Sequence, residues 1–151
     1  MKKQKGFSLI ELLIVVAIIL IIAAIAIPNL IKSKMAANEA SAVGSVRTIN
    51  TSEVAYASAC PSVGFTTTIG DFGAGPCPGA QNLLDSQLVT GTKSGYTFTL
   101  GGSSGTPIVT YTINANPLSA SSGTRYFFSN ESGVIRYKTG GQAGATDSAL
   151  Q

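Results

Sequence analysis

The chain has 151 residues, 44% of them hydrophobic, with 10 basic and 7 acidic side chains, two cysteines and no histidine. This length provides for one modest domain in addition to a membrane segment. The absence of histidine excludes a nucleophile activated by imidazole, and two cysteines alone offer too few ligands for a zinc site. The acidic residues lack the paired spacing of catalytic carboxylates, so we expect a protein that is not an enzyme and needs no metal and no cofactor.

The N-terminus places a cluster of lysines, Lys2, Lys3 and Lys5, before a long apolar run. From Leu12 to Ile31 no residue is charged, and this length is close to the roughly 20 residues that a helix needs to cross a bilayer core. The positive-inside rule keeps the lysines in the cytoplasm, which places the rest of the chain outside. The sequence therefore predicts a single-pass protein of the inner membrane.

One carboxylate, Glu11, lies just inside this apolar run. An ionised side chain near the edge of a membrane span is costly, so its presence argues for a partner or a task. Two simpler interpretations stay open. The segment is a plain anchor, or it is an ordinary signal peptide whose small residues at 24–26 mark a cleavage site that releases a soluble binding protein beginning at Ile27. Neither accounts for Glu11.

Past the membrane segment the apolar residues continue at helical spacing. The predicted stripe consists of Ala36, Ala40, Val43, Val46, Ile49 and Tyr56. Together the two parts predict one helix from Phe7 to about Ala57, far longer than the usual globular helix. Its first half anchors the chain, and its second half seats a domain. Pro28 lies inside the pattern and removes a backbone donor, so we expect a kink or a local loosening there.

Residues 58–95 are rich in Gly, Pro, Ser and Thr, which is typical of an irregular connection. A short helix is predicted from Gln81 to Leu88. Both cysteines, Cys60 and Cys77, fall in this region, and an even cysteine count in an exported domain favours a disulfide. In the chain-entropy model this bond contributes about 3 kcal/mol and pins the end of the long helix.

The last third of the chain predicts antiparallel sheet. Apolar and polar residues alternate over 96–100 and 109–113, and the segments 126–128 and 134–137 flank a hairpin turn at 130–133. With one sheet face on the long helix, this gives an α+β fold, a long helix packed on an antiparallel meander of about four strands. Residues 139–151 are expected to form a flexible tail.

The run Lys5-Gly6-Phe7-Ser8-Leu9-Ile10-Glu11, with the apolar residues that follow it, resembles the N-terminal signal of type IV pilins and pseudopilins. The resemblance is tight through Pro28 and elsewhere extends only to the layout. It implies that a prepilin peptidase cuts between Gly6 and Phe7 and methylates the new N-terminus. The segments expected on this basis are a leader (1–6), a transmembrane assembly half-helix (7–31), an amphipathic half-helix (32–57), a disulfide-bearing connection (58–95), the sheet (96–138) and the tail.

The resemblance also implies roles for two residues in assembly. The Glu11 carboxylate of one subunit neutralises the α-amino group of Phe7 on another and sets the register, and removing one partner of such a buried pair costs about 3–5 kcal/mol. Residues 20–27, before Pro28, unwind in the filament, although a simple kink is an equal alternative. Loss of the leader lysines lowers the basic residues from 10 to 7, against 7 acidic ones, so nucleic acid is not expected as a direct specific partner.

The resemblance leads us to expect a structural subunit that polymerises into an extracellular type IV pilus, with adhesion, twitching motility and DNA uptake as properties of the fibre. Its implied partners are a prepilin peptidase, an assembly ATPase with its platform protein, minor pilins and a secretin. The alternative is a pseudopilin of a type II secretion system, which forms a short periplasmic pseudopilus. Major pseudopilins typically have an Asp-rich calcium loop near the C-terminus, whereas residues 140–147 here contain one acid, Asp147.

Overall fold

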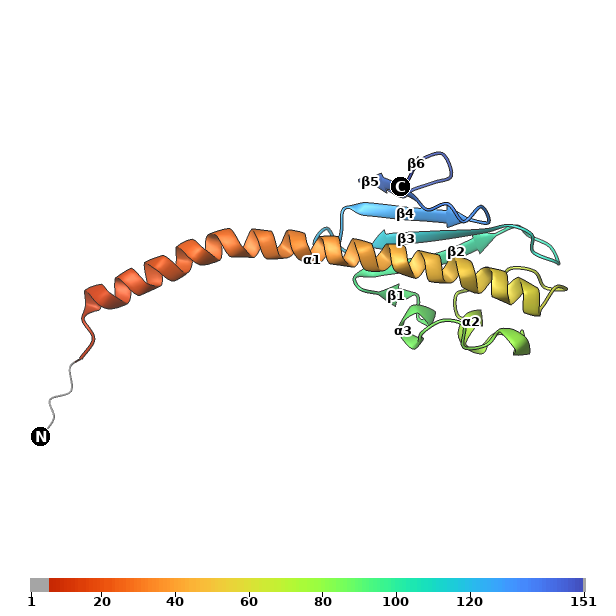
Figure 1. The fold of residues 1–151 in the computed structure, drawn as a ribbon, viewed down its shortest axis with the longest axis horizontal. Coiled ribbons are helices and arrows are strands. Elements are labelled where there is room, and N and C mark those ends of the chain that lie inside the picture. The colour runs from red at the N-terminus through yellow and green to blue at the C-terminus, as the bar shows by residue number, and fades with distance from the viewer. Residues whose placement is uncertain (1–5, 151) are drawn as a thin grey trace, which may run out of the picture. The chain divides into compact units, whose positions relative to one another are not determined.

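The computed structural model describes residues 6–150 (Figure 1). The predictions made for Lys2, Lys3 and Lys5 concern positions outside the described residues. The chain divides into two compact units, Met1–Lys34 and Met35–Gln151. We call the second unit the head, and we describe each unit by itself.

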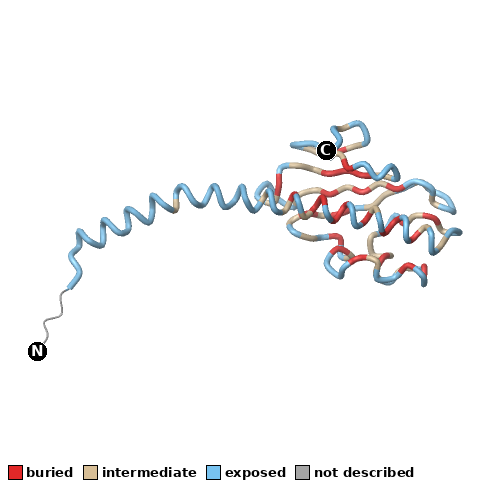
Figure 2. The backbone as a smooth tube through the Cα atoms, viewed as in Figure 1, coloured by how far each residue is buried: buried red, intermediate tan, exposed pale blue. Residues whose placement is uncertain are grey.

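One helix, α1, runs over Leu9–Ala59 and contains Pro28. Its bounds agree within two residues with the predicted 7–57. In its part before residue 35, the side chains are exposed apart from the half-buried Ala23 (Figure 2). Because residues 12–28 are all apolar, this stretch is apolar on every face, which is typical of a helix in a non-aqueous surrounding.

Within the head, α1 buries one stripe against the sheet. The buried residues are Glu39, Ala42, Val43, Ser45, Val46, Ile49, Ser52, Glu53 and Tyr56. The predicted stripe is right at its last four positions but wrong at Ala36 and Ala40, which are exposed. Apolar spacing alone missed the start of the stripe, because an acidic residue, Glu39, occupies the position that faces the sheet.

The sheet is antiparallel throughout, with the strand order β1-β2-β3-β4-β5-β6. The strands are β1 (Thr92–Lys93), β2 (Tyr96–Gly102), β3 (Tyr111–Pro117), β4 (Arg125–Asn130), β5 (Arg136–Thr139) and β6 (Ser148–Ala149). The predicted meander and the β4–β5 hairpin are confirmed, but the strand count of about four is too low. The extra strands, β1 and β6, have two residues each and are too short to produce a pattern of alternation.

Two further differences come from local backbone chemistry. The predicted helix at 81–88 is reduced to α3 (Ser86–Val89), because the Asp85 side chain accepts hydrogen bonds from two N–H groups of its first turn and caps it there. Asn82, at a φ of 58°, interrupts any earlier start. The remaining short elements are α2 (Asp71–Ala74) and η1 (Pro78–Ala80).

The core of the head lies between the buried stripe of α1 and one face of the sheet (Figures 1 and 2). Strand pairing places Phe98 opposite Ala115, and Ala115 opposite Phe127, in one row across the sheet. All three are at most 2% exposed. Tyr96 and Phe127 pack with ring centroids 5.9 Å apart. Alternation along each strand therefore puts the aromatic side chains under the helix.

Candidate processing and assembly segment

The predicted cleavage point, between Gly6 and Phe7, precedes the first residue of α1. Phe7 is 86% exposed, and no described atom lies within 4 Å of the place where a Cβ of Gly6 would stand. The structure thus places the two residues in an open, non-helical stretch, which a processing enzyme can reach.

Glu11 lies in the first turn of α1, where its Oε2 accepts a hydrogen bond from the Ser8 N–H at 2.8 Å. Ser8 directly precedes the helix and Glu11 is its third residue, so this contact is one half of a capping box. The negative charge also lies at the positive end of the helix dipole. Our reading of the sequence missed this role, although Ser-x-x-Glu before an apolar run is its known signal.

The capping hydrogen bond uses only part of the hydrogen-bonding capacity of Glu11. A carboxylate has two oxygens and accepts several hydrogen bonds, and this side chain is exposed. It is also the single charged residue between Lys5 and Lys32. The geometry therefore leaves Glu11 able to accept a cation from another molecule while it caps its own helix.

The part of α1 before residue 35 exposes a continuous set of large apolar side chains. They are Leu9, Ile10, Leu12, Leu13, Ile14, Val15, Val16, Ile18, Ile19, Leu20, Ile21, Ile22, Ile25, Ile27, Leu30 and Ile31. Within residues 6–150, α1 is the one helix that is long and apolar enough to cross a membrane. Exposed apolar surface of this size marks a contact with lipid or with other proteins.

Pro28 lies within the continuous helix. It has no N–H, so the carbonyl of Ala24 loses its usual helical donor. In the same turn the Asn29 amide donates to the carbonyl of Ile25 at 3.0 Å, and the Ser33 hydroxyl donates to the carbonyl of Asn29 at 3.0 Å. Side chains thus add hydrogen bonds next to the one that the proline removes.

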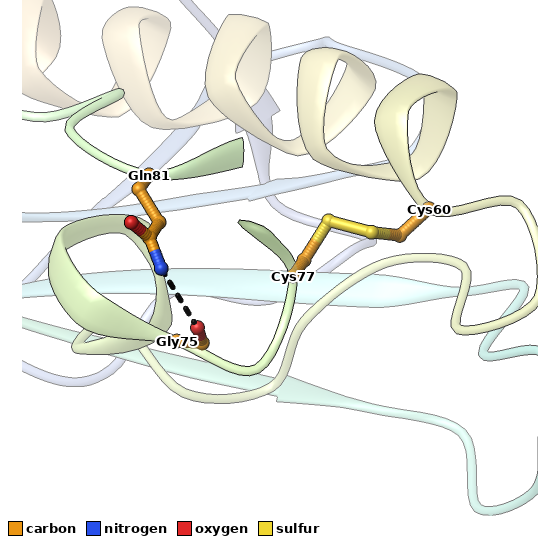
Figure 3. Close-up of a disulfide and its surroundings, with 4 residues drawn as sticks. All are labelled: Cys60, Gly75, Cys77 and Gln81. Carbon is orange, nitrogen blue, oxygen red and sulfur yellow. Dashed lines mark hydrogen bonds between the residues drawn. A yellow bond between two sulfur atoms is a disulfide. The ribbon is translucent and has the colours of Figure 1, made fainter. Parts of the chain in front are cut away.

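The predicted disulfide joins Cys60 and Cys77, with the two Cα atoms 6.2 Å apart (Figure 3). Cys60 directly follows α1, and its N–H still donates to the carbonyl of Tyr56 at 2.9 Å. Cys77, which is 1% exposed, directly precedes η1. The bond therefore fixes the end of the helix to the connecting segment, as expected.

A partly buried ion pair holds the beginning of the head. Glu39 is 6% exposed, and its Oε2 accepts from Arg125 Nε at 2.7 Å. Its Oε1 accepts from the N–H groups of Thr124 and Arg125 at 2.8 and 3.2 Å. Burial alone would raise the pKa of Glu39, but these hydrogen bonds and the charge of Arg125 together lower it. The guanidinium also lies 5.6 Å from the ring centroids of Phe127 and Tyr137.

A second polar contact joins α1 to the sheet in the middle of the head. Asn50 Oδ1 accepts from the Tyr111 hydroxyl at 3.0 Å, and Asn50 Nδ2 donates to Ser129 Oγ at 2.9 Å. Burial, with the charges of Glu53 and Glu131, raises the pKa of Tyr111 to about 12. This phenol therefore stays protonated and keeps its donor role at neutral pH.

The described part of the chain holds no group of three or more His, Cys, Asp or Glu side chains arranged to bind a metal. In the C-terminal segment the carboxylate of Asp147 accepts from the Gly144 N–H at 2.8 Å. Its backbone carbonyl accepts from Arg136 at 2.8 Å. These two hydrogen bonds fix the turn at residues 144–147, one from within the turn and one from Arg136 of β5.

An exposed apolar helix preceded by Gly6-Phe7, with Glu11 in its first turn and its later part packed on an antiparallel sheet, defines a pilin-like protein. Residues 1–27 match the family described as the prokaryotic N-terminal methylation motif. The chain thus carries the N-terminal motif of type IV prepilins.

Two relatives extend this finding. The chain is 59% identical over 39 residues, 26% of its length, to the type IV wide pilus major component PilA4 of Thermus thermophilus. It is 45% identical over 54 residues, 36% of its length, to the type IV major pilin protein PilA of Myxococcus xanthus. The matched segments span 30% and 24% of these relatives, so the likeness does not extend over their full lengths. No solved structure matches the chain.

Proposed function

We propose that this protein is a structural subunit that polymerises into an extracellular type IV pilus. The observation that carries the proposal is the exposed apolar part of α1, in which Glu11 is the single charge between Lys5 and Lys32. A surface of this kind needs lipid before assembly and other subunits after it. The similarity to two major pilins supports the same assignment.

Processing of the chain is the first step of the proposal. A prepilin peptidase cuts between Gly6 and Phe7 and methylates the new N-terminus. The open, non-helical conformation of these residues supports access to the bond. Removal of residues 1–6 gives Phe7 a positively charged amino group, four residues before Glu11.

The second step of the proposal sets the register between neighbouring subunits in the fibre. In the membrane, the Phe7 amino group of one subunit pairs with Glu11 of another, because each charge would otherwise stay unpaired in a medium of low dielectric. The Ser8 contact supports this role, since it fixes the carboxylate at the start of the helix. Residues 20–27 loosen next to Pro28 when the fibre extends. A kink at Pro28 without unwinding is the simpler form of the same idea.

The location of the protein follows from its segments. The precursor spans the inner membrane with residues 1–6 in the cytoplasm, residues 7–31 in the bilayer and the rest outside. The segments at 32–57, 58–95, 96–138 and 139–151 then form the amphipathic half-helix, the connection, the sheet and the tail of an exported head. The Cys60–Cys77 bond supports an oxidising surrounding for that head.

The proposed role is structural rather than enzymatic. Adhesion, twitching motility and DNA uptake belong to the assembled fibre. The partners are further copies of the chain, a prepilin peptidase, an assembly ATPase with its platform protein, minor pilins and a secretin. A pseudopilin of a type II secretion system would share the N-terminal segment, but it would form a short polymer in the periplasm.

Mass spectrometry of the N-terminus, in sheared extracellular material and in membranes, tests the proposal. We expect a chain that starts at methylated Phe7 in high-molecular-weight fibres. The same terminus confined to membrane fractions would favour the pseudopilin, and a soluble chain starting at Ile27 would overturn both. Glu11→Gln should abolish or strongly reduce fibres. The matched variant Glu131→Gln, at an exposed carboxylate of the head, should leave them unchanged.

A further inference from the structure

Glu53 lies on α1 within the head and is fully buried, at 0% exposure. Its Oε2 accepts a hydrogen bond from the Thr66 N–H at 3.0 Å, while its Oε1 has no partner among the described residues. Thr66 is 2% exposed, and its hydroxyl donates to Asp71 Oδ2 at 2.6 Å. One threonine therefore bridges two carboxyl groups.

Among the described residues, the titratable groups that face Glu53 carry no positive charge. Asp71 of α2 presents a like charge. Tyr56, three residues along α1, is buried with an unpartnered hydroxyl, and Tyr111 of β3 senses the charge of Glu53. The two ion pairs found in the described chain involve other carboxylates. An ionised Glu53 would thus be a buried, uncompensated charge.

Burial raises the pKa of Glu53 to about 7, against the hydrogen bond from Thr66 and with a further contribution from Asp71. The side chain therefore changes its charge close to neutral pH. In the neutral form the buried charge disappears. The Tyr56 hydroxyl lies one helical turn away and has no partner among the described residues. Its chemistry allows a hydrogen bond with a neutral carboxyl group.

The segment that depends on this contact is residues 66–74. On its N-terminal side, the Phe65 N–H is fixed to the carbonyl of Ile108 at 3.0 Å. Toward its end, the buried Phe72 packs on Tyr56 with ring centroids 5.8 Å apart. Between these two attachments, the Thr66 N–H bond to Glu53 ties the segment to α1.

We propose that Glu53 is a proton-operated latch: in its neutral form it lets residues 66–74 stay packed against α1, and its ionisation places an uncompensated charge in this buried site and so releases that segment. Cys60 and Cys77 lie on either side of the segment and are joined by a disulfide, so a released segment stays tethered at both ends. Closing is therefore reversible. The inference concerns the head alone and does not depend on the proposed function.

Linkage gives the expected size of the effect. If opening returns Glu53 to its ordinary pKa of 4.5 from about 7, the opening constant rises roughly 70-fold between pH 5 and pH 8. The folded form holds the extra proton, so protection must fall, not rise, as the pH increases. Most of the change falls between pH 5 and pH 7.

Hydrogen exchange of the full chain in detergent micelles, followed by mass spectrometry and corrected for the intrinsic rate at each pH, tests the latch. We expect peptides that cover residues 66–74 to lose protection by roughly 70-fold from pH 5 to pH 8. Peptides from β3, which exchange through global unfolding, serve as the internal reference and should stay better protected than residues 66–74 at both pH values. Equal protection of residues 66–74 at both pH values would overturn the proposal.

Variants separate the latch from general effects of pH. Glu53→Gln keeps an acceptor for the Thr66 N–H but cannot ionise, so its protection should be independent of pH. Asp71→Asn removes the like charge and should move the transition to lower pH. Glu131→Gln should behave as the wild type. A pH dependence that survives in Glu53→Gln would contradict the latch.

A spectroscopic measurement covers the case in which Glu53→Gln does not fold. In the wild-type chain with ¹³C-labelled glutamate, one carboxyl carbon should titrate near pH 7. Asp71→Asn should move that midpoint to lower pH. If no glutamate carboxyl titrates above pH 6, the latch is wrong.

Discussion

The two parts of α1 use the same kinds of side chain in opposite ways. Before residue 35 the helix exposes its large apolar residues on all faces, and Ile19 is 58% exposed. In the head the same helix buries one stripe, and Ile49 is 0% exposed. The head therefore has the partner surface for its apolar residues within its own chain. The earlier part has none among residues 6–34 and has to find lipid or another molecule.

The carboxylates of α1 extend this comparison. Glu11 is exposed and caps the helix, Glu39 is buried and paired with Arg125, and Glu53 is buried without a cation. Three identical side chains thus lie at an exposed helix end, in a salt bridge and in a buried site without a cation. Burial and partners, rather than residue type, decide what each one does.

The largest expected effect separates the two parts of the helix by one type of substitution. Ile49→Ala creates a cavity in the core and should lower the free energy of unfolding of the head by about 2–5 kcal/mol. Ile19→Ala removes a side chain that contacts no core, and it should leave that free energy unchanged. Urea denaturation of the full chain in micelles measures both. Equal losses in the two variants would show that the exposed segment contributes to the stability of the head.

Removal of the disulfide should come next in size. The disulfide closes a loop between cysteines 17 positions apart. In Cys60→Ser/Cys77→Ser the unfolded chain regains the conformational entropy that this loop removes, which lowers the free energy of unfolding by about 3 kcal/mol. The same denaturation experiment measures it. Reduction of the wild-type protein is the matched control and should give the same loss, while α1 before residue 35 should keep its helical circular dichroism.

The pH dependence of stability should distinguish the two buried carboxyl groups. The pKa of Glu53 is higher in the folded state, so stability falls as the pH rises from 5 to 8, by about 2–3 kcal/mol. The pKa of Glu39 is lower in the folded state, so its contribution is present at neutral pH and is lost only as the pH falls below the ordinary carboxyl range. Chemical denaturation at a series of pH values measures both slopes. Glu53→Gln should remove the first slope and keep the second.

The smallest effect concerns the cap at the start of α1. Glu11→Ala should fray the first turn, at about 0.5–1 kcal/mol, whereas Glu11→Gln keeps the capping side chain and removes only the charge. Amide exchange of Ser8 in micelles should therefore increase in Glu11→Ala and stay nearly constant in Glu11→Gln. If both variants lose fibres but only Glu11→Ala frays, the charge and the cap are separate functions of one residue.

Sequence reasoning predicted the features that repeat along the chain. The length of α1 and the order of the four longer strands follow from the 3.6-residue and two-residue periods. The Cys60–Cys77 bond follows from the cysteine count in an exported context. The motif at residues 5–11 predicted the match to the N-terminal methylation family.

The features that the sequence did not predict depend mainly on single pairs of residues far apart in the chain. Glu39 and Arg125 are 86 positions apart, and no local pattern connects them. That pair also explains the error at Ala40, since a charged residue took the place expected for an apolar one. Val109 was predicted in a strand, but β3 begins at Tyr111 and Val109 is 64% exposed. The cap from Ser8 to Glu11, in contrast, is local and could have been read from the sequence.

The two shortest strands limit how heads can associate. β1 and β6 form the edges of the sheet, and each has only two residues. A strand this short has few backbone groups of its own, so another molecule finds little ladder to extend on β1 or β6 themselves. Amyloid-like stacking of heads through their backbones is thereby discouraged. Contacts between copies at β1 and β6 would therefore rest mainly on side chains, which makes them specific to the sequence of the partner.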